Sequence, residues 1–276
     1  MVQVPDVVLN NGVSIPQLGF GVFQVPPGET QQAVEAALEA GYRHIDTAAA
    51  YRNEAAVGAA IRLSGLPREE LFITTKLRNG EQHMARGAFD SSLAKLRLDY
   101  VDLYLIHWPV PSQGRYVEAW KELEKIQSDG GARAIGVSNF LPEHLETLLA
   151  DARTTPAVNQ LEIHPSLQQA AAVERSRSLG MAVEAYSPLG QGVDLDHPVI
   201  TSLAEQRGAT PAQIILAWHL AQGTIVIPKT VNQARMAENL ASAGLTLTAE
   251  DVAAVSALEA GNRVGADPAT AAFTQL

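Results

Sequence analysis

The chain has 276 residues, of which 46% are hydrophobic, and its formal net charge is −10. This acidic balance argues against a nucleic-acid-binding protein, and no stretch approaches the roughly 18 consecutive apolar residues of a membrane span. The absence of cysteine excludes disulfides, thiolate metal sites and a cysteine nucleophile, and it makes a reducing cytoplasm the expected location.

The beginning of the chain predicts a small hairpin followed by a first buried strand. The opening sequence MVQVPDVVLNNG lacks a basic start followed by an apolar core, so we expect no signal peptide. The Asn11-Gly12 pair between two apolar runs is a strong turn signal and predicts a β-hairpin. A strand is expected around residues 18–22, where Gly19 and Gly21 would let another backbone or a ligand approach closely.

Segments with helical periodicity follow, and short apolar runs separate most of them. The expected helices cover residues 28–40, 54–65, 87–97, 116–129, 142–151, 167–179, 198–207, 211–221, 232–240 and 249–258. Asn53 is expected to cap the second helix, with Glu54 in its first turn, where the helix dipole favours an anion. Gly261, Gly265 and Pro268 predict an irregular arm over residues 261–276.

Seven of the apolar runs end on polar or ionisable residues, 22 to 43 positions apart. These end residues are Asp46, Lys76, His107, Ser138 with Asn139, Gln160, Tyr186 and Lys229. The spacing leaves room for a strand and a crossover helix before each next parallel strand. In a closed parallel barrel all strand C-termini open onto one face, so these side chains would meet at a single site.

Two architectures suit this alternation of strands and helices, the closed barrel and the open doubly wound sheet. An open sheet that binds a dinucleotide usually has GxGxxG after its first strand, and that pattern is absent. Its polar end residues would also gather where the strand order reverses, whereas here they follow every strand. We therefore predict an α/β protein, a single (β/α)8 TIM barrel domain over residues 1–276, with an N-terminal β-hairpin and an irregular C-terminal arm.

The end residues of three neighbouring strands, together with Tyr51, suggest carbonyl chemistry. A buried Lys76 would keep its charge beside Asp46. An ammonium about 4 Å from the Tyr51 oxygen would favour the phenolate by ~4 kcal/mol at an effective dielectric near 20. That would lower the tyrosine pKa from ~10 to about 7 if desolvation does not oppose it. Tyr51 could then give and take a proton, and His107 would orient the substrate oxygen.

A hydride donor is then required, and a nicotinamide coenzyme is implied because no side chain supplies hydride. Ser138, Asn139 and Gln160 are short polar groups able to hold a carboxamide, and Tyr186 could stack on a ring. The flexible loop 187–192 could fold across a pyrophosphate. The cationic groups and a hydroxyl at the last strand end would bind a 2′-phosphate at a helix N-terminus; these residues are Lys229, Thr230 and Arg235.

Other residues of reactive type have simpler interpretations as parts of the protein's framework. The residues that we expect to be hydrogen-bonded or packed inside the protein are His44, His164, His219, Tyr104, Trp120 and Trp218. Asp102 lies towards the opposite rim of the barrel, where a structural ion pair is expected. Phe23 and Trp108 adjoin strand ends and are expected to form apolar walls of a carbonyl pocket.

The sequence closely resembles the aldo-keto reductase superfamily. The resemblance covers essentially the whole chain and is clearest in the motifs that contain these residues. The matching motifs are GYRHIDTAAAYRNEAAVG (41–58), LFITTK, VDLYLIHWP, IGVSNF, VNQLEIHP, AYSPLGQG and IPKTVNQARMAENL. The resemblance implies a monomeric, metal-free (β/α)8 barrel that reduces small aldehydes and ketones with NADPH. The wording of the motifs is similar to the prokaryotic branch that includes 2,5-diketo-D-gluconate reductases.

The resemblance also implies roles for individual residues. The catalytic residues that it implies are Asp46, Tyr51, Lys76 and His107. The cofactor-binding residues that it implies are Ser138, Asn139, Gln160, Tyr186, Ser187, Leu189, Gln191, Lys229, Thr230, Val231, Arg235, Glu238 and Asn239. Relatives usually have Trp where this chain has Arg78, and we expect that arginine to be exposed and solvated.

Two other functions are compatible with parts of the sequence. A Schiff-base lyase or isomerase on the same barrel would use Lys76 as a nucleophile and would not need the cationic pocket. A nucleotide-sensing subunit would hold NADPH without turnover. No added interaction arm supports the second alternative.

Overall fold

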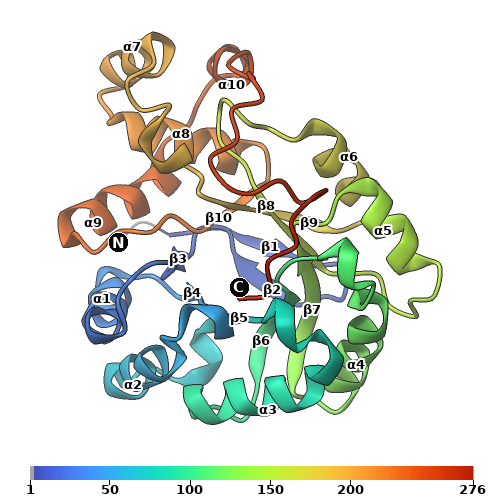
Figure 1. Ribbon diagram of the computed structural model, residues 1–276. Coiled ribbons are helices and arrows are strands. Elements are labelled where there is room, and N and C mark those ends of the chain that lie inside the picture. Colours follow the sequence, from blue (N-terminus) through green and yellow to red (C-terminus); the bar gives the residue numbers. More distant parts are fainter. Residues whose placement is uncertain (1–2, 276) are drawn as a thin grey trace.

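The structure of the protein, a computed structural model, describes residues 3–275. A sheet of eight parallel strands forms its centre, and helices pack around the outside (Figure 1). The sheet runs from β10 to β3 without a change in order, so each strand lies beside its neighbour in the chain. The strands are β1 (Asp6–Val8), β2 (Ser14–Pro16), β3 (Phe20–Gly21), β4 (His44–Asp46), β5 (Phe72–Leu77), β6 (Val101–Ile106), β7 (Ala132–Ser138), β8 (Val158–Glu162), β9 (Ala182–Tyr186) and β10 (Ile225–Val226).

The helices follow the periodic segments closely. They are α1 (Pro27–Ala40), α2 (Glu54–Ser64), α3 (Ala85–Leu96), α4 (Tyr116–Ser128), α5 (Pro142–Leu149), α6 (Ala170–Ser178), α7 (Pro198–Arg207), α8 (Pro211–Ala221), α9 (Gln233–Ala241) and α10 (Ala249–Ser256). The largest difference is at α6, which begins three residues later than predicted. A turn between His164 and Leu167 and the left-handed backbone of Gln169, with φ of 49°, delay its start.

The first and last strands close the sheet into a barrel. Leu18 forms a parallel bridge with Val226, and the amide of Gly19 donates to the Val226 carbonyl at 2.8 Å. A Cβ at Gly21 would lie 2.9 Å from the carbonyl oxygen of Ile227, so only glycine allows this approach without a shift of the backbone. The predicted (β/α)8 TIM barrel, with close backbone contact at Gly21, is confirmed.

The predicted hairpin consists of β1 and β2, and it covers the amino-terminal end of the barrel, behind the barrel in Figure 1. Two asparagines of its turn bind the backbone at the start of β7 and just before β8. Asn10 Nδ2 donates to the Pro156 carbonyl, and Asn11 Nδ2 donates to the Arg133 carbonyl, both at 3.0 Å. Ile15 of β2 is fully buried. Because this end is covered, the carboxyl ends of the strands form the accessible mouth.

The C-terminal arm has no helix or strand from residue 261 to 275; residue 276 lies outside the described residues. In Figure 1 the arm crosses the front of the barrel. Asn79 Nδ2 donates to the Phe273 carbonyl at 3.1 Å, and the Gly80 amide donates to the Thr274 carbonyl at 3.1 Å. Arg78 Nε donates to the Gln275 carbonyl at 3.0 Å. The expected exposed, solvated arginine is therefore only partly solvated: its side chain is 30% exposed, and the arm passes within reach of the guanidinium.

Asn53 also differs from its prediction. It precedes α2, but its side chain makes no capping hydrogen bond. Its Oδ1 accepts from the Thr47 hydroxyl at 2.9 Å, and its Nδ2 donates to the Val22 carbonyl at 3.1 Å. The amide is used to join the ends of the first two barrel strands, so it is not available to the helix.

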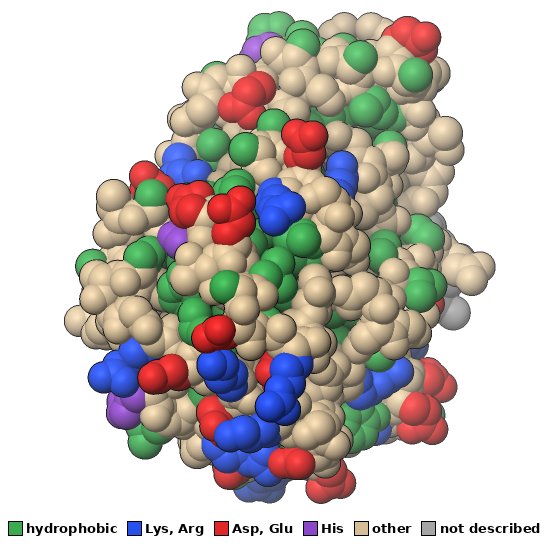
Figure 2. Space-filling view, turned by 90° about the vertical axis from the view of Figure 1, so that its right-hand side faces the viewer, with side chains coloured by type: hydrophobic (Ala, Val, Ile, Leu, Met, Phe, Trp, Pro, Cys, Tyr) green, Lys and Arg blue, Asp and Glu red, His purple; other side chains and the backbone are tan. Residues whose placement is uncertain are grey.

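Asp102 has the structural role that was predicted for it. Its two oxygens accept hydrogen bonds from Arg68 at 2.6 Å and Arg133 at 2.8 Å, and the amide of Ile73 donates to it at 2.9 Å. On the face shown in Figure 2, acidic and basic side chains are interspersed and hydrophobic side chains are scattered. None of the helices within residues 3–275 has the length and apolarity needed to cross a membrane.

Candidate active site

The four predicted catalytic residues converge at the mouth of the barrel. Asp46 ends β4, Lys76 lies near the end of β5, His107 follows β6, and Tyr51 ends the short 3-10 helix η1 (Ala49–Tyr51). Side chains two residues apart in a strand share a face, so His44 and Asp46 both point into the barrel. The strand ends thus bring together residues that lie up to 61 positions apart in the sequence, from 46 to 107.

Lys76 is fully buried, and its ammonium group uses all three of its donors. Nζ donates to Asp46 Oδ1 at 2.5 Å, to the Thr47 carbonyl at 3.1 Å and to the Tyr51 hydroxyl oxygen at 3.3 Å. Burial lowers the pKa of Lys76, but the charge of Asp46 and the neighbouring Tyr51 oppose this effect, and the pKa ends above its usual value. The lysine is therefore charged and held in place.

The pKa of Tyr51 does not fall to about 7 as predicted. Burial raises the pKa of this phenol, the Lys76 ammonium lowers it, and the pKa remains above its ordinary value of 10.0 because burial has the larger effect. The Coulomb argument required that desolvation should not oppose the ammonium, and this condition is not met, because the loss of hydration has the larger effect. Tyr51 therefore carries its proton at neutral pH.

His107 lies against Tyr51, with ring centroids 5.6 Å apart in an edge-to-face arrangement. Burial, followed by the nearby charge of Lys76, places the pKa of His107 well below its usual value, so the imidazole is neutral. Within residues 3–275, neither ring nitrogen of His107 forms a hydrogen bond. A neutral imidazole has one N–H group, which is available here to an oxygen atom placed between His107 and Tyr51.

Apolar side chains border this site. The Phe23 ring lies 5.1 Å from the Tyr51 ring, measured between centroids, and is 40% exposed. Trp108 is buried and lies 5.0 Å from Phe273 of the C-terminal arm. Phe273 was not predicted, because no local pattern in an irregular arm indicates which part of the barrel it contacts. Both predicted aromatic residues are therefore near the mouth, together with one that the sequence did not reveal.

The short polar residues predicted to hold a carboxamide form a connected network. The Ser138 hydroxyl donates to the Gln160 carbonyl at 2.9 Å, and Asn139 Nδ2 donates to the Ser138 hydroxyl at 3.1 Å. The Tyr186 hydroxyl donates to Asn139 Oδ1 at 2.9 Å. These residues orient one another before any ligand binds.

The side chain of Gln160 already makes hydrogen bonds within the protein that were not predicted. Its Nε2 donates to Asp46 Oδ2 at 2.9 Å and to Glu184 Oε2 at 2.8 Å. Its Oε1 accepts no hydrogen bond from any described residue, so it can still accept one from an amide N–H. Glu184 was not singled out from the sequence, although its position two residues before Tyr186 places it on the same face of the strand.

The cationic residues lie beside the start of α9. Asn232 caps this helix by accepting from the Arg235 amide at 3.2 Å, and the Thr230 hydroxyl accepts from the Asn232 amide at 3.1 Å. Lys229 and Arg235 are exposed, and no acidic side chain among residues 3–275 lies within ion-pair distance of either. Two free cations, a hydroxyl and a helix N-terminus together suit a phosphate group. The donor set therefore fits the implied coenzyme.

The remaining predicted cofactor residues lie in the loop after β9 and in or just before α9. Ser187 and Gln191, in the loop after β9, have positive φ angles of 45° and 54°, and Leu189 lies between them. Val231 is half exposed beside Thr230. The Glu238 carboxylate accepts from the Thr210 hydroxyl at 2.7 Å, so part of its hydrogen-bonding capacity already serves α8. Asn239 is buried in α9.

The other predicted framework residues have hydrogen-bonded or packed positions. His164 Nδ1 lies 2.9 Å from Asp194 Oδ2, and His219 Nε2 lies 3.1 Å from the Pro188 carbonyl. His44 lies 3.3 Å from both the Thr74 hydroxyl and the Pro16 carbonyl. The aromatic residues that are buried as predicted are Tyr104, Trp120 and Trp218.

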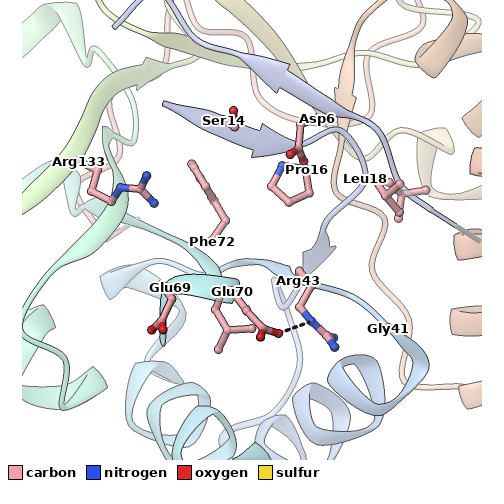
Figure 3. A pocket seen from close by; sticks show the side chains of 12 residues that line it. Asp6, Ser14, Pro16, Leu18, Gly41, Arg43, Glu69, Glu70, Phe72 and Arg133 are labelled. Carbon is pink, nitrogen blue, oxygen red and sulfur yellow. Dashed lines mark ion pairs between the residues drawn. The ribbon is translucent and has the colours of Figure 1, made fainter. Parts of the chain in front are cut away.

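A cavity of about 370 Å³ lies at the opposite end of the barrel (Figure 3). Asp6, Ser14 and Pro16 of the hairpin line one side of it. Arg43 and Glu70 line another side, and Arg43 Nε lies 4.0 Å from the Glu70 carboxylate. None of the four candidate catalytic residues lines this cavity.

Three comparisons agree with this geometry. The sequence profile of the Aldo/keto reductase family matches residues 17–197 and 195–260. An aldo-keto reductase of Mycolicibacterium smegmatis is 52% identical over 272 residues, or 98% of this chain and 99% of that protein. The methylglyoxal reductase DkgA of Yersinia pestis is 48% identical over 270 residues, or 97% and 98% of the two chains. The solved structure of a mutant of Gox0644 in complex with NADPH has a TM-score of 0.94 and 42% identity, and the match covers 98% and 100%.

Proposed function

The chain belongs to the Aldo/keto reductase family, and from this premise we propose that it reduces aldehydes and ketones to alcohols with NADPH. In this proposal Tyr51 donates the proton to the carbonyl oxygen. One observation carries the assignment: a fully buried lysine has one donor on the Tyr51 oxygen and its other two on Asp46 and a backbone carbonyl.

The proton chemistry follows from that arrangement. Tyr51 is protonated at neutral pH, so it is ready to donate in the direction of reduction. As the proton leaves, negative charge develops on the phenol oxygen, 3.3 Å from the Lys76 ammonium. An ammonium already in position stabilises that charge without reorganisation. Asp46 keeps Lys76 oriented and charged throughout.

His107 and the apolar residues position the substrate. The neutral His107 ring would donate a hydrogen bond to the same carbonyl oxygen, which fixes its direction relative to Tyr51. Phe23, Trp108 and Phe273 would exclude water from the reacting carbon. A drier site strengthens the interaction between the developing phenolate and Lys76.

The coenzyme would bind along the strand ends from β7 to β10. When bound, the nicotinamide supplies the hydride. Gln160 Oε1, Ser138 and Asn139 would hold its carboxamide, and the Tyr186 ring would stack on it. The loop residues proposed to contact the pyrophosphate are Ser187, Leu189 and Gln191. The residues proposed for the 2′-phosphate and adenine end are Lys229, Thr230, Val231, Arg235, Glu238 and Asn239. The NADPH complex of the similar Gox0644 mutant supports this proposal.

Small carbonyl compounds are the proposed substrates. The relative named methylglyoxal reductase supports a dicarbonyl, and the motif wording is compatible with a diketo sugar acid. We further propose that the whole chain forms one domain and acts as a cytoplasmic monomer without a metal ion. The Schiff-base alternative is less favourable, because a charged lysine with three hydrogen bonds is a poor nucleophile.

The test is NADPH consumption by the purified protein with a panel of dicarbonyls, keto sugars and aromatic aldehydes, ranked by kcat/KM. We expect turnover with several of them and deuterium transfer from labelled NADPH to the carbonyl carbon of the product. Binding of NADPH without turnover of any carbonyl would favour the sensing subunit. A covalent amine trapped by borohydride at Lys76 would favour the Schiff-base enzyme.

A further inference from the structure

A second buried carboxyl group lies beside the catalytic lysine, and the chemistry proposed above does not use it. Glu184 is the middle residue of β9 and has no exposed surface. Gln160 is its partner in the parallel register of β8 and β9. Through its two N–H groups, Gln160 joins the carboxyl group of Glu184 to that of Asp46. Glu184 is therefore connected to Asp46, one of the proposed catalytic residues, through the single side chain of Gln160.

The chemistry of the amide determines how Gln160 is oriented. Its side-chain nitrogen has two hydrogens, and both neighbouring groups are carboxyl groups that can accept them. The opposite orientation would direct the amide oxygen at Asp46 Oδ2, an ionised carboxylate oxygen that has no hydrogen to donate and no other donor among the described residues. The orientation with Nε2 facing Asp46 and Glu184 is therefore strongly preferred.

The other oxygen of Glu184 faces His44. Oε1 is 3.5 Å from His44 Nε2. It is buried, and no described residue donates a hydrogen bond to it, so an ionised carboxyl group would leave this oxygen unsatisfied. His44 Nδ1 is 3.3 Å from the Pro16 carbonyl, which can only accept, so Nδ1 carries the hydrogen. A neutral His44 then presents the lone pair of Nε2 to both the Thr74 hydroxyl, at 3.3 Å, and Glu184 Oε1. Glycine at position 19 is required here, because a Cβ would overlap the His44 ring.

The charge balance of the cluster also favours a neutral Glu184. Lys76 is the cation nearest to both carboxyl groups, and none of its three donors reaches Glu184. Two buried carboxylates joined by one amide would repel each other and share a single ammonium. We propose that Glu184 is a positioning residue that stays protonated at neutral pH, with its proton directed at His44 Nε2 and its other oxygen holding Gln160 against Asp46.

The expected ionisation agrees with this geometry. Burial, followed by the charge of Asp46, raises the pKa of Glu184 to about 8, and burial lowers the pKa of His44 to about 4. The groups around Glu184 are His44 and Asp46 from β4, Tyr51 from η1, Lys76 from β5, Gln160 from β8 and the apolar Ile225 from β10.

Loss of the proton above about pH 8 would place a second negative charge beside Asp46. That charge opposes the negative charge that develops on Tyr51 during reduction, so turnover should fall. This consequence rests on the proposed reductase function, whereas the protonation state of Glu184 does not depend on it.

The decisive variant is Glu184→Gln, because glutamine keeps an oxygen for Gln160 and an N–H for His44 but cannot ionise. We expect kcat at pH 7 within about threefold of the wild type, and the alkaline fall of kcat should move up by at least one pH unit. Asp102→Asn removes another buried strand carboxylate at the opposite rim, and it should leave the position of the alkaline fall unchanged.

Infrared spectroscopy of the coenzyme-free protein provides a second measurement that needs no turnover. The difference spectrum between wild type and Glu184→Gln at pH 7 should contain the carbonyl stretching band of one protonated carboxyl group, and this band should disappear as the pH rises through about 8. Absence of the band at pH 7 would overturn the proposed protonation state. A band accompanied by an unshifted kcat profile, or a loss of more than tenfold in kcat at pH 7 for Glu184→Gln, would overturn the positioning role.

Discussion

At the scale of single residues, the proposed proton donor and the lysine that would stabilise its phenolate are separate groups with different burial. Tyr51 lies at the mouth and is partly exposed, while Lys76 is fully buried and bound to Asp46. Burial keeps the tyrosine proton in place, and the ammonium reduces the free energy needed to remove it during the reaction. The two effects act on the same atom in opposite directions.

Removal of the Tyr51 hydroxyl tests its role directly. Tyr51→Phe should lower kcat by at least about 100-fold, because general acid catalysis contributes roughly 10²–10⁴-fold. The Kd for NADPH should stay within about twofold, since the hydroxyl is proposed to act on the substrate. Tyr100→Phe, at a partly exposed ring beneath Arg68, is the matched control and should keep wild-type activity. Near-normal turnover of Tyr51→Phe would exclude Tyr51 as the proton donor.

Lys229 tests coenzyme preference. Its side chain is exposed, without an acidic partner among the described residues, beside the capped start of α9. Lys229→Ala should raise the KM for NADPH at least about tenfold and change the KM for NADH much less, because only NADPH carries the 2′-phosphate. Lys121→Ala, at an exposed lysine paired with Asp151, is the control. Equal losses with both coenzymes would contradict the phosphate pocket.

At the scale of elements, a buried charge cluster joins three segments around the mouth. Glu162 at the end of β8 accepts from the amides of Val264 and Gly265 in the C-terminal arm, at 2.7 and 2.9 Å. His164 lies between Glu162 and Asp194, which follows the loop after β9. This cluster connects the arm, which contributes Phe273 to the mouth, with the loop proposed to cover the coenzyme.

Glu162→Gln should therefore loosen the arm. The Glu162 carboxylate uses one oxygen for each of the two amides, but a glutamine has only one oxygen. Its NH2 group would face the second backbone amide, which would lose its acceptor. We expect hydrogen exchange at the Val264 and Gly265 amides to accelerate at least about tenfold at pH 7. Asp267→Asn, whose carboxylate binds within the arm to the Ala269 amide, should leave exchange at residues 264 and 265 unchanged. Unaltered exchange in Glu162→Gln would show that other contacts hold the arm.

At the scale of the whole molecule, three buried histidines give the stability a pH optimum. Burial lowers the pKa of His44 to about 4 and of His219 to about 3, below the ordinary value of 6.5. Burial also lowers the pKa of His164, but the hydrogen bonds to Asp194 and Glu162 outweigh it and raise the pKa to about 9. The first two histidines favour the folded state when neutral, and the third favours it when charged.

The sign of the pH dependence follows from these directions. The contribution of His44 and His219 is complete above pH 6.5 and is lost as the pH falls towards 4 and 3. The contribution of His164 is complete below pH 6.5 and is lost as the pH rises through about 9. Urea unfolding at pH 4, 7 and 10 should show the largest free energy of unfolding near pH 7. His219→Gln should reduce the acid slope by up to about 1.4 kcal/mol per pH unit, and an unchanged slope would contradict the assignment.

The sequence by itself determined the succession of elements and the chemical identity of the mouth. Helical periodicity and the polar residues at strand ends are local patterns, and parallel strands necessarily bring their ends to one face. Asp46, Lys76 and His107 could therefore be grouped before any coordinates were known, and the family motifs point to the same residues.

Only the tertiary structure decided the properties that depend on neighbours from distant segments. The pKa of Tyr51 depends on how completely other elements remove water from it, and a pairwise estimate from sequence gave the wrong direction. Arg78 and Phe273 acquire their contacts only where the chain end crosses the barrel. The connection of Glu184 to Asp46 requires the register of β8 and β9 together with barrel closure. Burial and long-range contacts are sums over the whole fold, whereas sequence patterns describe a single element at a time.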